Sequence, residues 1–248
     1  MPTKGVTDRQ RVAESLIAAA RAHAPEVGDQ LRVELAELTQ DGEALPDFTH
    51  FHVQLAGYLE RRLAALVEAE ARHQSRLDSH REARLRRDAA GAELEHQIIE
   101  LRETVSAVWG SNAVEEILGI PGSTAGGLLT LERCAERILT WVRERQAKGL
   151  PEPRPGLEID LDPLLEDLAA KHEELRRILE EEAKARRALE TTRQGLGWAL
   201  AVVDQAVRGV ARLLQGCYHL ADCSEYSRRI RLTAPRHRVA RTQSGRES

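Results

Sequence analysis

The fold is decided by a proline-free stretch at positions 48–109, which reads FTHFHVQLAGYLERRLAALVEAEARHQSRLDSHREARLRRDAAGAELEHQIIELRETVSAVW. Without proline, nothing in this stretch forces a helix to break, and one continuous helix would run for about 93 Å. A second stretch of equal length, residues 157–218, contains a single proline, Pro163, near its start. We therefore predict one long helix used twice.

Apolar residues in both stretches recur at alternating steps of three and four, the spacing of one helix face. In the first stretch this face is apolar at its ends, as at Leu63 and Leu101, but residues 70–91 are polar on nearly every side. The second stretch is also charged near its centre, for example at Arg186. Two such helices would pair antiparallel with their apolar ends covered.

The connector at residues 110–156 favours a hairpin because it is short and contains its own helix. It consists of a glycine-rich turn at 119–127, an amphipathic helix at 128–148 and a proline-rich linker at 150–156. In the symmetric register, facing positions sum to about 266. This register predicts three pairs: Arg84 with Glu182, Glu70 with Arg193, and His80 with Arg186.

A rival interpretation places a turn at residues 86–91, RRDAAG, which would split the first long helix inside a compact bundle. The predicted fold class is all-α: an elongated, coiled-coil-like antiparallel hairpin with an accessory helix and an N-terminal helical arm. The expected divisions are the arm at 1–45, the hairpin at 46–232 and a disordered basic tail at 233–248. In the arm, Thr7 or Asp8 would cap a helix ending near His23, and a second helix would cover 28–39.

Composition indicates long helices rather than a sandwich or barrel, with 42% hydrophobic, 31% charged and 3% aromatic residues. The first 20 residues lack a signal-peptide core, and no stretch is apolar enough to span a membrane, so we expect a cytoplasmic protein. The cysteines, Cys134, Cys217 and Cys223, form no CxxC pair and are expected to be free thiols.

The spacing Glu-x-x-His occurs at Glu70/His73 and at Glu93/His96, and di-iron carboxylate bundles place two ligands with this spacing. Both pairs fall on one predicted helix, about 34 Å apart, whereas a di-iron site draws ligands from several helices. We therefore expect no metal and no cofactor. No GxSxG, HExxH or P-loop pattern is present, and we expect no enzymatic activity.

The end of the chain is strongly basic. Residues 228–248 contain seven arginines and one glutamate, and the arginines considered for nucleic-acid binding are Arg228, Arg229, Arg231, Arg236, Arg238 and Arg241. Such a segment would contact nucleic-acid phosphates, an anionic membrane or the protein's own acidic body. It has no aromatic residue after Tyr226 on which a base would stack.

Several turn and cap motifs resemble those of uncharacterised helical proteins from GC-rich bacteria such as myxobacteria. They are Leu101-Arg102 through Trp109-Gly110, then Ile117 to Ile120, Gly122-Ser-Thr, Leu128 and the proline-rich exit. The resemblance covers residues 46–235 and implies an all-helical fold without a known activity. This chain departs from it at Asp222-Cys223, where such proteins continue LAGL.

Together these observations predict a cytosolic helical scaffold or assembly protein that binds a protein partner or a second copy through its helix faces. The expected partner surface is the polar middle of the first long helix, at Glu70, His73, His80, Arg84 and Arg87. The alternatives are a nucleic-acid-associated protein that uses the arginine-rich tail and a metal-binding helical bundle.

Overall fold

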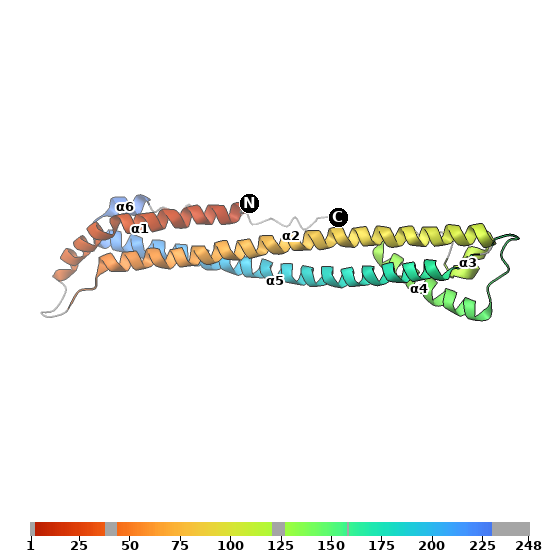
Figure 1. The fold of residues 1–248 in the computed structure, drawn as a ribbon. Helices are drawn as coiled ribbons and strands as arrows, with labels where there is room; N and C mark the ends of the chain where they lie inside the picture. The colour runs from red at the N-terminus through yellow and green to blue at the C-terminus, as the bar shows by residue number, and fades with distance from the viewer. Residues whose placement is uncertain (1–2, 38–43, 121–126, 158, 230–248) are drawn as a thin grey trace, which may run out of the picture. The chain divides into compact units, whose positions relative to one another are not determined.

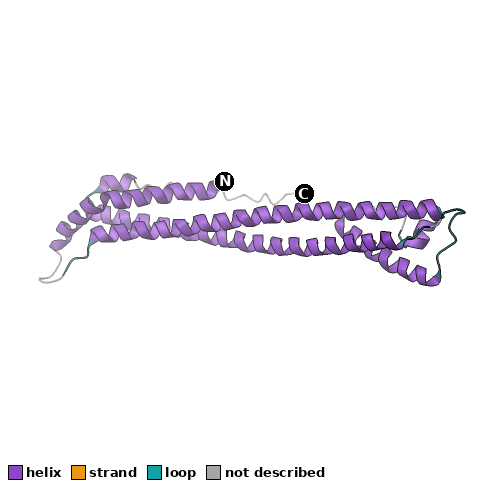
Figure 2. Cartoon of the chain, viewed as in Figure 1, coloured by secondary structure: helices purple, strands orange, loops and turns teal. Residues whose placement is uncertain are grey.

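The computed structural model describes residues 3–37, 44–120, 127–157 and 159–229, and 87% of these residues are helical with no strand among them (Figures 1 and 2). The chain forms two compact units. Unit 1 comprises residues 1–72 and 194–248, and unit 2 comprises residues 73–193. The two long helices pass through both units.

The long helices are α2 (Phe48–Trp109) and α5 (Asp162–Leu220), and each is continuous. The turn considered at residues 86–91 is therefore wrong. Gly91 is buried inside α2, and a Cβ atom there would collide with the Leu128 side chain. This glycine permits close packing rather than a turn.

Helix α1 (Lys4–Ala36) corrects the prediction of two short helices in the N-terminal arm. Pro25 lies inside it, although proline removes one backbone hydrogen bond from a helix. Buried residues on both sides of the proline, including Ala24, Val27 and Leu31, hold the helix together by packing. The N-cap residue is Thr3, so neither Thr7 nor Asp8 begins the helix.

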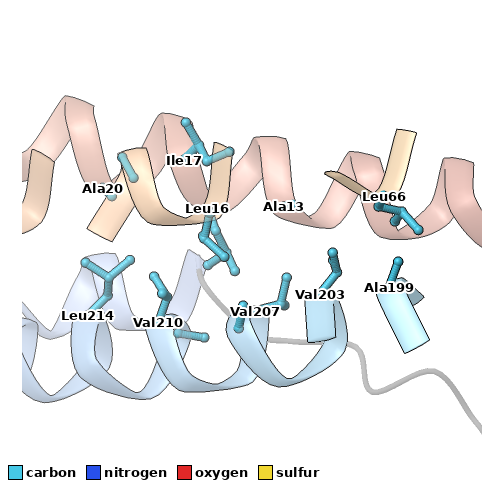
Figure 3. Packing of buried hydrophobic residues seen from close by; sticks show 14 of the residues in the cluster. Ala13, Leu16, Ile17, Ala20, Leu66, Ala199, Val203, Val207, Val210 and Leu214 are labelled. Carbon is cyan, nitrogen blue, oxygen red and sulfur yellow. The ribbon is translucent and has the colours of Figure 1, made fainter. Parts of the chain in front are cut away.

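In unit 1, α1 packs against the first part of α2 and the last part of α5. Figure 3 shows Leu16 of α1 lying over Val207 and Val210 of α5, and Ile17 belongs to the same core. Leu59 and Leu66 of α2 complete the same core. The short helix α6 (Ser224–Arg229) follows α5.

Unit 2 contains the remaining parts of the long helices together with α3 (Ala113–Leu118) and α4 (Leu128–Lys148). Helix α4 has the bounds expected from its amphipathic pattern, and it buries Leu131, Ala135, Ile138 and Val142. Six residues of the glycine-rich turn, 121–126, lie outside the described residues.

The structure confirms the all-α helical hairpin, and within unit 2 the pairing of α2 with α5 follows the predicted register to within about one helical turn. Two of the predicted pairs are wrong. Glu182 binds Arg87 rather than Arg84, and His80 approaches Glu182 rather than Arg186. Arg84 is exposed to solvent.

Candidate interaction surface

Most of the charged residues that were predicted to form a partner surface instead make contacts within the chain. In unit 2, Arg87 donates to both carboxylate oxygens of Glu182 at 3.0 Å, and His80 Nε2 lies 3.8 Å from Glu182 Oε1. The three side chains are only 16–20% exposed. A hydrogen bond to Asp88 is the main cause that raises the pKa of Arg87, with Glu182 contributing. These groups join α2 to α5.

Two further members of that predicted surface, Glu70 and His73, also form contacts within the fold. In unit 1, Glu70 accepts a hydrogen bond from the Thr3 amide. In unit 2, His73 Nδ1 lies 3.3 Å from Thr192 Oγ1. Arg193, the residue expected to pair with Glu70, contacts Glu190 on its own helix at 3.8 Å.

We expect the partly buried ion pair between Arg87 and Glu182 to stabilise the fold more than an exposed ion pair does. Arg87→Leu should lower the free energy of unfolding by about 1–2 kcal/mol, because it leaves the Glu182 carboxylate poorly compensated. The double variant Arg87→Leu/Glu182→Leu should recover most of that loss. Urea unfolding followed by circular dichroism measures both.

The matched control is the pair Arg177 and Glu174, whose side chains are 56% and 50% exposed. Removing that exposed pair should leave the unfolding free energy almost unchanged. Equal losses for Arg87→Leu and Arg177→Leu would contradict the conclusion that the Arg87–Glu182 pair joins α2 to α5 in unit 2.

The candidate metal ligands are not gathered into a site. Glu93 and His96 are exposed on α2, and Glu93 lies 3.6 Å from Lys171. Across the described parts of the chain, no group of three His, Cys, Asp or Glu side chains is arranged to hold a metal ion. All three cysteines are free thiols, and burial raises the pKa of Cys134 and Cys217.

Aromatic residues fix α6 to the rest of unit 1. Tyr226 stacks on His23 at 3.8 Å between ring centroids and donates a 2.6 Å hydrogen bond to Glu26. The fully buried Tyr218 contacts both of these rings, and burial raises its pKa to about 12. Its ring also lies nearly parallel to that of His52, which is fully buried as well. The cluster anchors α6 on α1 and α5.

The arginine-rich tail is described only at its beginning. Arg228 is exposed near the end of α6. The remaining candidate positions, Arg231, Arg236, Arg238 and Arg241, lie outside the described residues, as does the side chain of Arg229.

An exposed apolar surface runs along α5 in unit 1, and we call it the α5 face. Trp198 is 68% exposed there, and Leu213 and Leu220 are also exposed. The face consists of Gly195, Trp198, Val202, Gly209, Leu213, Gly216 and Leu220. At 100° per residue these seven positions fall within a sector of about 60°.

The glycines of the α5 face leave open space beside the bulky residues. A Cβ atom added at Gly195, Gly209 or Gly216 would meet nothing within 4 Å. Glycine inside a helix costs about 1 kcal/mol relative to alanine, and packing within unit 1 does not require these three. They allow another backbone to approach α5 closely.

The α5 face was not predicted because its residues lie outside the apolar seam that builds the core. The available signal was a surplus of apolar and small residues outside that seam, in the low-charge run QGLGWALAVV at 194–203. An amphipathic surface helix would carry polar residues there. The surplus indicates a surface that interacts with another molecule.

A groove of about 700 Å³ separates α1 from α2 in unit 1. Its apolar lining comprises Ile17, Ala18, Leu63, Ala64, Val67 and Ala71, and its polar lining comprises Gln10, Glu14, Arg21, Glu60 and Glu68. An ion pair between Arg21 and Glu60, 2.8 Å long, links the two helices beside the groove.

No protein-family model, curated protein or solved structure matches the chain. A search of the described residues finds no helix that is both long and apolar enough to cross a membrane.

Proposed function

We propose that this chain is a non-enzymatic cytoplasmic assembly protein that binds a second copy of itself through the α5 face. The observation that carries the proposal is the exposed Trp198 on a helix face that also presents the exposed side chains of Leu213 and Leu220. Large exposed apolar patches on soluble proteins commonly mark interaction sites, and aromatic side chains dominate binding energies there.

The order of large and small residues along the face supports a second copy as the partner. When two α5 helices cross antiparallel near Val207 and Arg208, Trp198 of each copy lies opposite Gly216 of the other. In the same register, Leu220 lies opposite Gly195, and Leu213 opposite Val202. A two-fold interface needs such a self-complementary surface, and here Trp198 and Leu220 each lie opposite a glycine.

Charge is consistent with the same arrangement. Asp204 and Arg208 lie outside the sector of the α5 face, and Asp204 is already paired with Arg9 of α1 at 2.8 Å. Within the sector itself, two copies would bring together only apolar residues and glycine.

The test is the solution mass of the full chain and of a disrupted variant. Sedimentation velocity should show a species of about 55 kDa, twice the chain mass of 27.7 kDa. Trp198→Glu should weaken the dimer at least 100-fold and leave a folded monomer, because a carboxylate would be buried in the interface.

The matched control is Leu85→Glu, since Leu85 is 63% exposed on α2 in unit 2. This variant should remain dimeric. In a cysteine-free background, Trp198→Cys/Gly216→Cys should give a covalent dimer under oxidation, whereas either single variant should not. A wild-type chain that stays monomeric at all accessible concentrations would refute the proposal.

A further inference from the structure

We propose that the groove between α1 and α2 binds the chain's own arginine-rich C-terminal segment, residues 230–248. This proposal concerns a different surface from the α5 face and does not depend on self-association. The proposal is supported by the apolar lining of the groove, by the charges on the two walls of the groove and by the position of the C-terminal end of α6.

The floor of the groove is suited to aliphatic groups. The floor is lined by Ile17 and Ala18 of α1 and by Leu63, Ala64 and Val67 of α2. The Val67 side chain is 45% exposed. Residues 230–248 contain Ile230, Leu232 and Val239 between arginines, whose side chains also have long apolar stems. Both kinds of group would cover this floor.

The walls are complementary in charge to the segment. Three glutamates and one arginine line the groove, and the arginine, Arg21, is already paired with Glu60. The remaining carboxylates are Glu14 on α1 and Glu68 on α2, which interact with Gln10 and Arg72 of their own helices. A guanidinium group entering from solvent would therefore meet one carboxylate on each wall.

The segment also begins near enough to reach the groove. Helix α6 ends at Arg229, and Tyr226 ties it to α1 at His23 and Glu26. The groove extends along α1 from Arg21 to Gln10, so its far end lies roughly 25 Å along the helix from Glu26. Residues 230–248 span up to about 60 Å when extended, which also allows a path around α1. Residues 230–248 contain five arginines and one glutamate, so their net positive charge is opposite to the net negative charge of the groove lining.

Photo-crosslinking of the full-length chain tests the contact directly. With Val67 replaced by p-benzoylphenylalanine, irradiation should link the groove to peptides from residues 230–248 in the monomeric band, as identified by mass spectrometry. The same replacement at Leu85, exposed in unit 2, should give at least fivefold less of this product. Absence of that difference would overturn the proposal, as would adducts found only in covalently linked dimers.

A second measurement examines the charges without altering the apolar floor. Under native conditions, trypsin should cleave after Arg236, Arg238 and Arg241 at least fivefold faster in Glu14→Gln/Glu68→Gln than in the wild type. The control Glu95→Gln/Glu100→Gln removes two exposed charges of α2 in unit 2 and should cleave at the wild-type rate. Equal cleavage rates in the two double variants would show that the groove does not hold the segment.

Discussion

Tyr218→Ala is expected to lower the free energy of unfolding by about 4 kcal/mol, the usual cost of removing a fully buried aromatic ring. Tyr218 has no exposed surface and contacts the rings of His23, His52 and Tyr226. Its loss would leave a cavity where α1, α2, α5 and α6 meet. Urea unfolding followed by circular dichroism, at concentrations low enough to keep the chain monomeric, measures the effect.

Two controls separate this loss from a general effect of removing an aromatic residue. Tyr218→Phe keeps the ring and removes only a long 3.5 Å hydrogen bond to the Ala19 carbonyl, so it should cost less than about 1 kcal/mol. Trp198→Ala on the exposed α5 face should change the unfolding free energy of the monomer by less than about 0.5 kcal/mol. Similar losses for Tyr218→Ala and Trp198→Ala would contradict the assignment of one ring to the core and the other to an interaction surface.

Gly28→Ala is expected to destabilise unit 1 by about 2–3 kcal/mol, since it inserts a methyl group where two helices touch. A Cβ atom at Gly28 in α1 would collide with Thr49 Oγ1 and come within 2.9 Å of the Thr49 backbone nitrogen in α2. The backbone cannot rotate away as a flexible side chain can. Thermal or urea unfolding of the purified variant measures the loss.

Gly209→Ala is the matched substitution at an open position. The added Cβ would meet nothing within 4 Å, so the higher helix propensity of alanine should raise the stability of the monomer by about 0.5–1 kcal/mol. The same change should weaken self-association, because Gly209 lies near the proposed two-fold axis. A loss of monomer stability at Gly209, or none at Gly28, would contradict the packing described for unit 1.

The long helices and the approximate register of their pairing could be predicted because both depend on local apolar spacing. The bounds of α4 followed from the same signal together with the glycine and proline residues around it. The break expected at Pro25 was wrong, because local propensity favours interruption while burial of Ala24, Val27 and Leu31 favours continuity. The predicted partner of Glu182 was Arg84, whereas the observed partner is Arg87, one turn further along α2. The apolar spacing sets the register of the two helices only to within about one turn.

The sequence by itself determined that this chain consists of long helices that fold back on each other. The spacing of apolar residues and the scarcity of proline favour a helix through interactions within a few turns, so their effect does not depend on distant residues. Only the tertiary structure decided which apolar residues lie in the core and which remain exposed. Trp198 and Tyr218 lie on the same helix, but the placement of α1 and α6 buries only Tyr218. Gly28 and Gly209 likewise differ because a second backbone lies against one and solvent against the other. These distinctions depend on contacts between residues far apart in the chain.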